Sequence, residues 1–171
     1  MNDARRAECE AQLMNSNQKA STAALLALSL VGAVVAQENQ EKKIKRSDLP
    51  AAVKKTVEGL SKDGHIRELS EEIQNGNTTY EVEMIVSGHT KDVEIDPTGA
   101  ITEIEEEVTM SSLSAEVKAG LVSKAAGGAI LKVESITKHG KLVAYEAEIE
   151  KAGKKSEVQV GPDGRPLDHK E

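Results

Sequence analysis

The chain has 171 residues and a formal net charge of −7, and 38% of its residues are hydrophobic. It contains no phenylalanine or tryptophan, and its two tyrosines, Tyr80 and Tyr145, are its only aromatic residues. An acidic chain that lacks a basic stripe and aromatic side chains for base stacking is excluded from the usual nucleic-acid-binding classes. Any core must consist of Val, Ile, Leu, Ala and Met side chains.

The N-terminal region has the features of an export signal. An uncharged apolar run of fifteen residues extends from Thr22 to Ala36, after Lys19 and before a polar stretch. A basic residue, a short apolar run and small residues before a cleavage point are typical of a secretory signal peptide. The run is shorter than the roughly 20 residues that span a bilayer, so no transmembrane anchor is predicted. We predict a signal peptide over residues 1–36 (with Met14 as an alternative start), cleavage after Ala36, and a periplasmic or secreted protein without stable membrane insertion.

Cysteine chemistry is excluded from the exported part. The single cysteine, Cys9, lies in the predicted signal peptide, so the mature chain has no thiol nucleophile, thiolate ligand or disulfide. The sequence also lacks the motifs of serine hydrolases, zinc proteases and phosphate-binding loops. We expect a non-enzymatic protein without catalytic residues, cofactor or metal.

The rest of the chain repeats itself. Residues 48–54 and 112–118 share Leu, Ala, Val and Lys at a spacing of 64, and Tyr80 matches Tyr145 at a spacing of 65. A register that is kept over this length with one insertion indicates a duplicated unit. We predict a linker at 37–47, a first copy at 48–108, a linker at 109–111 and a second copy at 112–171.

Each copy is predicted to begin with a helix and to continue as an antiparallel meander. Apolar residues recur at helical spacing over 49–60 and 113–121. Alternation of apolar and polar residues predicts strands at 80–86, 93–95, 143–150 and 157–160. Tight turns are predicted at Ser87-Gly88, His139-Gly140 and Ala152-Gly153. The expected fold class is α+β, with two tandem copies of an N-terminal helix packed on a small antiparallel sheet.

Three of these stretches resemble the PepSY and PepSY-like family, which includes proteins similar to β-lactamase-inhibitor proteins. They are the helix opening Leu49-Pro50-Ala51-Ala52-Val53, the strand Tyr80-Glu81-Val82-Glu83 and the hairpin from Val93 to Ile101, and all three recur in the second copy. The resemblance implies a signal peptide, tandem copies, and a role in inhibiting or chaperoning secreted peptidases or in binding envelope partners. The family has no known catalytic residues, so none is assigned.

Acidic residues are concentrated in the first copy. Residues 48–108 carry a net charge of −10, and residues 112–171 carry a net charge of +1. Like charges opposed across strands destabilise a sheet by roughly 0.2–1 kcal/mol per pair. Retained acidic residues on the sheet side away from the helix are therefore our candidate partner-binding residues. They are Glu81, Glu83, Asp92, Glu94, Glu146 and Glu148.

Several functions remain open at this point. The first is an exported binding module that docks a secreted or envelope protein, inhibitor-like if that protein is a peptidase. The alternative is a cation-binding or small-ligand-binding sensor that uses the acidic sheet faces. A third possibility is a plain structural role. The acidic residues would then only keep a half-exposed sheet soluble. The run Glu105-Glu106-Glu107 is also acidic, but no loop around it has the oxygen spacing of a known calcium motif.

Overall fold

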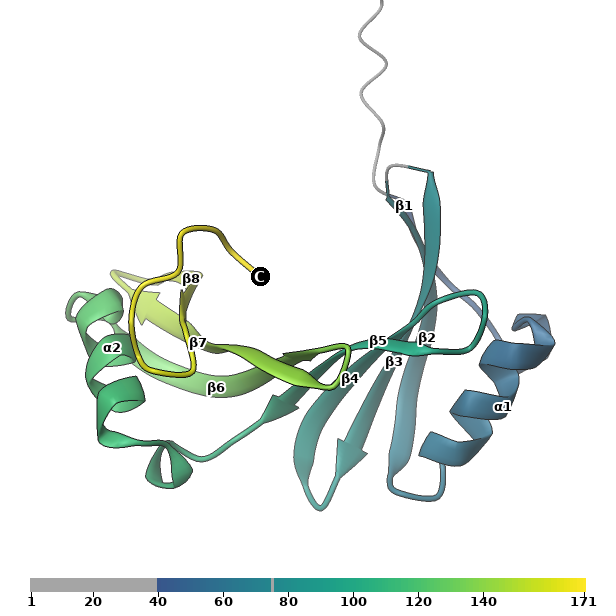
Figure 1. Cartoon of the computed structure of the whole chain (residues 1–171), viewed down its shortest axis with the longest axis horizontal. Helices are drawn as coiled ribbons and strands as arrows, with labels where there is room; N and C mark the ends of the chain where they lie inside the picture. The colour runs from purple at the N-terminus through teal and green to yellow at the C-terminus, as the bar shows by residue number, and fades with distance from the viewer. Residues whose placement is uncertain (1–39, 75) are drawn as a thin grey trace, which may run out of the picture. The chain divides into compact units, whose positions relative to one another are not determined.

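A computed structural model of the chain describes residues 40–74 and 76–171 (Figure 1). The signal peptide and the cleavage point predicted within residues 1–39 lie outside this part. Within it, no helix is both long and apolar enough to cross a membrane. The elements are β1 (Gln40–Lys43), α1 (Ala51–Leu60), β2 (His65–Gln74), β3 (Asn77–Val86), β4 (His89–Ile95), β5 (Ile101–Glu107), α2 (Ala115–Ala125), β6 (Ala129–Lys138), β7 (Lys141–Lys151) and β8 (Lys154–Val160).

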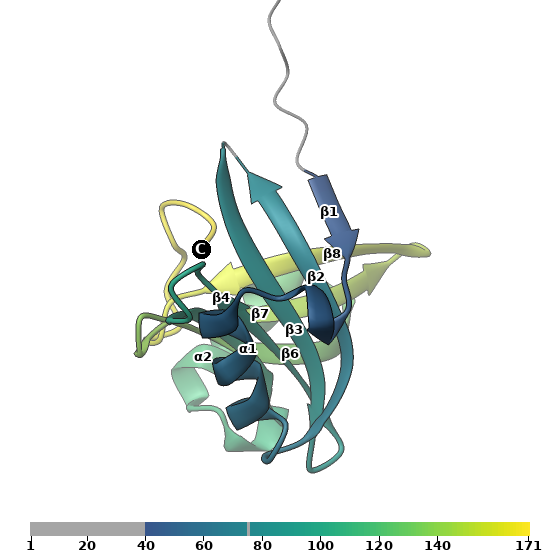
Figure 2. The same cartoon turned by 90° about the vertical axis from the view of Figure 1, so that its right-hand side faces the viewer.

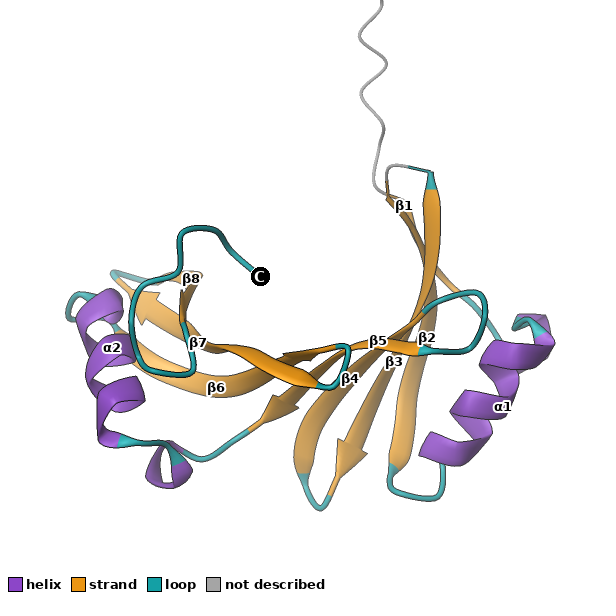
Figure 3. Ribbon diagram, in the orientation of Figure 1, coloured by secondary structure: helices purple, strands orange, loops and turns teal. Residues whose placement is uncertain are grey.

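All eight strands belong to one antiparallel sheet, in which their order is the order of the sequence (Figure 3). The prediction of two tandem copies, each with its own small sheet, is therefore wrong. The two predicted sheets are joined because β5 pairs with β6, over residues 103–107 and 134–138. Separate meanders would leave the main-chain groups of both strands at open edges, and pairing them satisfies these groups.

Two segments have structure that was not predicted from the sequence. The stretch predicted as a linker, 37–47, contains β1, which pairs with β2 although its residues Gln-Glu-Lys-Lys have no apolar alternation. After β8 no further strand follows, and the chain returns only through an isolated bridge between Val160 and Pro166. The first half of the sheet therefore consists of β1–β5, and the second half consists of β6–β8.

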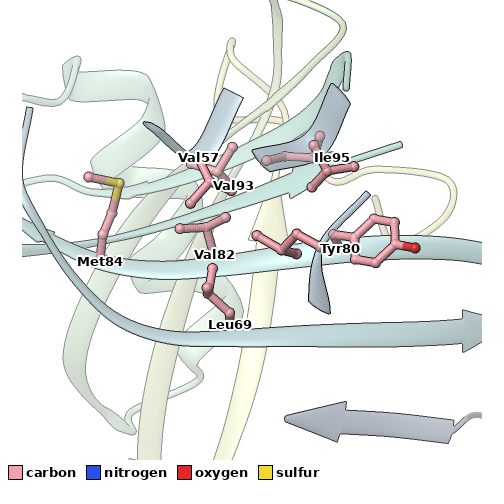
Figure 4. Close-up of a cluster of buried hydrophobic side chains, with 9 residues drawn as sticks. Val57, Leu69, Tyr80, Val82, Met84, Val93 and Ile95 are labelled. Carbon is pink, nitrogen blue, oxygen red and sulfur yellow. The ribbon is translucent and has the colours of Figure 1, made fainter. Parts of the chain in front are cut away.

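The core lies between the sheet and its two helices. Val53 and Val57 of α1 are fully buried in a cluster with Leu69, Val82 and Val93 from β2, β3 and β4. Figure 4 shows part of this cluster, and Figure 2 shows α1 in front of these strands. A second cluster surrounds α2 and is built by Val117, Leu121, Ala125, Val133, Ala147, Ile149 and Val160. The first cluster also contains Tyr80 and Met84, and Tyr145 packs against the second, so both clusters use the side chains that the composition allows.

Both helices cover the same face of the sheet. Val93 of the α1 cluster lies opposite Ile104 of β5, which lies opposite Thr137 of β6. Thr137 shares its side of β6 with Val133, a member of the α2 cluster, because side chains two or four residues apart on a strand point the same way. The other face of the sheet carries no helix, and we call it the open face.

The tight turns predicted from the sequence are confirmed. Val86 pairs with His89, and Lys151 pairs with Lys154, which leaves two-residue loops between the strands. In each loop both residues have positive φ, at 53° and 91° in Ser87-Gly88 and at 52° and 74° in Ala152-Gly153. This is the backbone of a type I′ turn, whose twist matches that of the flanking strands.

Candidate binding surface

Strand alternation places a grid of acidic side chains on the open face. In one row across the sheet, Glu81 of β3 lies opposite Glu94 of β4, which lies opposite Glu103 of β5. In the next row, Glu83 lies opposite Asp92, which lies opposite Glu105. Carboxylates directly opposite each other are separated by about 5 Å at Cβ, so each row gathers three like charges.

These rows surround a shallow pocket over the first half of the sheet. The pocket has a volume of about 190 Å³. Its lining consists of six carboxylate side chains and one valine, namely Glu72, Glu81, Asp92, Glu94, Glu103, Glu105 and Val93. A pocket with this lining suits a positively charged group and disfavours an anion.

Partial burial and mutual repulsion raise the pKa values of several of these groups. Burial, followed by the neighbouring Glu72 and Asp92, raises the pKa of Glu81 to about 7. Burial also raises the pKa of Glu105 to about 7, with repulsion from Glu146 and Glu134 as the next causes. The pKa of Asp92 rises to about 6, chiefly through burial and then through Glu134. A cation that compensates their charge would therefore favour the ionised form of these carboxylates.

Positive side chains neutralise the acidic residues unevenly. Over the second half of the sheet, Lys132 Nζ lies 2.8 Å from Glu134 Oε1, and Lys155 Nζ lies 2.5 Å from Glu148 Oε1. Among the described residues, Glu81, Asp92, Glu94 and Glu105 form no ion pair, and Glu103 has only Lys138 at 3.7 Å. The uncompensated negative charge is therefore concentrated over β3, β4 and β5.

The structure places all six candidate residues on the open face, but in two different environments. Glu81, Asp92 and Glu94 line the pocket, and Glu83 lies opposite Asp92 at its side. Glu146 and Glu148 instead contact lysines, at 3.4 Å from Lys170 and 2.5 Å from Lys155 respectively. Only the first group presents free negative charge to a ligand.

Four acidic residues of this surface were not among the candidate partner-binding residues assigned from the sequence: Glu72, Glu103, Glu105 and Glu134. The alternation of Glu103, Ile104 and Glu105 was a usable signal, but only the pairing of β4 with β5 brings Glu105 to Asp92. The run Glu105-Glu106-Glu107 does not converge, because Glu106 points to the opposite face and lies 3.7 Å from Lys91. Cross-strand partners, not sequence neighbours, build the surface.

Two groups of three carboxylates have the spacing of a cation site. One oxygen each from Asp92, Glu105 and Glu134 lie within 4.8 Å of one another. A second group joins Glu41 of β1 with Glu72 and Glu81. Hard divalent cations such as Ca²⁺ prefer carboxylate oxygens but take six to eight ligands, so water or further protein oxygens would complete either group.

No family model matches this chain, and no curated protein matches it. Solved structures do match. A DUF2874 family protein of Bacteroides ovatus has 17% identity and a TM-score of 0.54, over 70% of this chain and 84% of that one. A candidate periplasmic protein of Bacteroides eggerthii has 14% identity and a TM-score of 0.56, over 70% and 86%. A BLIP-like protein of Bacteroides fragilis has 18% identity and a TM-score of 0.51, over 71% and 85%.

These likenesses bear on the fold. Each covers more than four fifths of the solved chain at low sequence identity. The β-lactamase-inhibitor-like part of the resemblance drawn from the sequence is thereby supported, whereas membership of the PepSY family stays a prediction. The chain has the fold shared by the DUF2874 and BLIP-like proteins.

Proposed function

We propose that this chain is an exported, non-enzymatic binding module of the bacterial cell envelope that docks a secreted or envelope protein through the open face. The observation that carries the proposal is the set of carboxylates over β3 to β5 without a positive partner, Glu81, Asp92, Glu94 and Glu105. The ligand they select is a basic segment of a partner protein.

The free protein retains electrostatic repulsion among the carboxylates over β3 to β5. Raised pKa values at Glu81 and Glu105 mean that the folded chain holds these groups at a cost when they are ionised. A lysine or arginine entering the pocket removes that cost and forms charge-assisted hydrogen bonds. Complementary charge also accelerates association and suppresses wrong partners. We therefore expect binding to weaken steeply with salt.

Export is the second part of the proposal. It is supported by the apolar run before Ala36 and by the candidate periplasmic protein of similar fold. The mass of the protein isolated from the envelope fraction tests it. We expect a chain that begins at Gln37, and a chain that still carries the apolar run in the cytosolic fraction would contradict export.

A pull-down with the exported protein tests the docking role. The bait is exposed to envelope extract and culture fluid at low and then at physiological salt. The variant Glu81→Lys/Glu94→Lys should lose the captured partner, because both residues line the pocket. The control Glu58→Lys/Asp63→Lys makes the same change of charge at exposed positions outside the sheet and should retain it.

The outcomes separate the alternatives. A single secreted protein that is retained by wild type and control but lost by the pocket variant supports the proposal, and a peptidase among such partners would give the inhibitor-like form of it. A partner retained by the pocket variant would contradict docking at this face. Equal loss from both variants would show that only net charge matters.

A second candidate is a cation-binding sensor, and the convergence of Asp92, Glu105 and Glu134 favours it. A ligand that binds only the folded state raises its melting temperature. Millimolar Ca²⁺ should then raise the Tm of wild type and of Glu58→Gln, but not of Asp92→Asn/Glu105→Gln. A Tm that Ca²⁺ leaves unchanged in wild type would remove this candidate while leaving the docking proposal intact.

A further inference from the structure

The segment of residues 166–171 follows a path that the docking role does not explain. After β8 the chain makes a compact turn, in which Gly161 N–H donates to Arg165 O at 2.8 Å, and Pro166 then bridges back to Val160. Lys170 and Glu171 contact side chains of the open face. The segment thus lies over the part of this face that β7 and β8 form.

Lys170 is the charged anchor of the segment. Its Nζ lies 3.4 Å from Glu146 Oε2 and donates to Glu157 Oε2 at 2.5 Å. Glu146 is 8% exposed, so one of the two carboxylates that Lys170 neutralises is almost completely buried. These hydrogen bonds raise the pKa of Lys170. Removal of the ammonium would leave the buried carboxylate without its charge partner.

The main chain of the segment is also held. Glu171 N–H donates to Gln159 Oε1 at 2.8 Å, and Gln159 Nε2 donates to Glu146 Oε2 at 2.8 Å. The carboxylate of Glu171 lies 3.6 Å from Lys138 Nζ. Gln159 therefore connects the backbone of the segment to the same buried carboxylate that Lys170 neutralises.

The same cross-strand arrangement exists over β3 and β4 without an occupant. Glu146 lies opposite Gln159 in β7 and β8, as Glu81 lies opposite Glu94 in β3 and β4. Among the described residues, no lysine or arginine forms an ion pair with Glu81 or Glu94, whereas Lys170 does so with Glu146. One half of the open face thus already holds a lysine-bearing chain segment, and the other half is free.

We propose that residues 166–171 are a tethered ligand of the open face over β7 and β8, which an external basic segment must displace to bind there. This inference rests on the proposed docking function. Because the segment is tethered, its effective concentration at the face over β7 and β8 is in the millimolar range. A weak external ligand cannot compete with it there and binds only over β2 to β5.

The test compares Lys170→Glu with Lys55→Glu, which makes the same change of charge at an exposed position of α1. The probe is a fluorescein-labelled hexalysine peptide, titrated by calorimetry and fluorescence anisotropy against the exported protein at low salt. We expect one peptide bound per chain in wild type, Lys55→Glu and Lys170→Arg, and two in Lys170→Glu. Equal stoichiometry in Lys170→Glu and Lys55→Glu would overturn the inference.

Hydrogen exchange provides a readout that does not depend on the probe. The Glu171 amide should be protected in wild type and Lys55→Glu and should exchange freely in Lys170→Glu. If no variant binds hexalysine, the docking function fails, and the exchange of this amide still decides whether the segment is held. A Glu171 amide that is unprotected in wild type would contradict the tethered-ligand inference, even if the peptide binds at the β2–β5 half.

Discussion

Asp92 of β4 lies directly opposite Glu105 of β5, so two carboxylates share one cross-strand position on the open face. Glu134 of β6 brings a third carboxylate within 4.8 Å of both. Opposed like charges cost a sheet stability, and here they coincide with partial burial. Repulsion among these carboxylates therefore lowers the stability of the free protein at the place where we expect its ligand. This effect can be measured.

Stability should fall as the pH rises from 5 to 8. The pKa of Glu105 is about 7 and that of Asp92 about 6, both above the values near 4 of the unfolded chain. Groups with a raised folded pKa stabilise the fold fully below the unfolded pKa, and this contribution is lost as the pH rises through the folded pKa. Thermal unfolding at fixed ionic strength should therefore give a higher Tm at pH 5 than at pH 8.

The variant Glu105→Gln should reduce this pH dependence. It removes one of the opposed charges, so at pH 8 it should stabilise the protein by about 0.5–1 kcal/mol, in the range of a like-charge pair. Glu58→Gln, at an exposed position of α1, is the control and should leave the slope of Tm against pH unchanged. A wild-type slope in Glu105→Gln would show that this carboxyl does not titrate between pH 5 and 8.

Gly164→Ala should destabilise the protein more than Gly153→Ala. Both glycines have positive φ, at 78° and 74°, but a Cβ at Gly164 would lie 2.2 Å from the carbonyl oxygen of Glu116, whereas nothing lies within 4 Å at Gly153. The left-handed conformation costs Ala about 1–2 kcal/mol, and overpacking adds about 1–3 kcal/mol at Gly164 only. Urea unfolding measures both changes, and equal losses would mean that the turn can move away from α2.

Ala152→Gly should stabilise the protein. Ala152 has a φ of 52° in its type I′ turn, which strains an alanine but not a glycine. Relief of the left-handed conformation contributes about 1–2 kcal/mol to the unfolding free energy, and the greater freedom of glycine in the unfolded chain offsets about 0.4–1 kcal/mol of it. Urea unfolding also tests this variant, and a loss of stability would show that the entropic effect dominates at this turn.

Leu121→Ala should be severely destabilising, because Leu121 is fully buried between α2 and the sheet. Loss of a buried leucine side chain costs about 2–5 kcal/mol. Val122→Ala on the same helix is the control: Val122 is 58% exposed and should change stability by less than about 0.5 kcal/mol. Similar values for both variants would contradict the packing of α2 described above.

The helices, the hairpin turns and the side of each strand on which a residue lies could be predicted from the sequence. The apolar spacing over 49–60 and 113–121 predicted α1 and α2, and two-residue turns such as Ala152-Gly153 predicted the hairpins. Alternation in β3 and β4 assigned Glu81 and Asp92 to the side of the sheet away from the helix. These features depend on residues close together in the chain, so their periodicity suffices to predict them.

Only the tertiary structure decided how these parts combine. The pairing of β5 with β6 joins into one sheet what the sequence predicted as two, and it brings Glu134 to Asp92 and Glu105. The docking of Lys170 on Glu146 follows from a turn after β8 that has no periodic signal. Strands pair where main-chain groups at a sheet edge still lack partners, and charged residues far apart in the chain pair where a charge is still uncompensated. Neither condition can be predicted from a local sequence pattern.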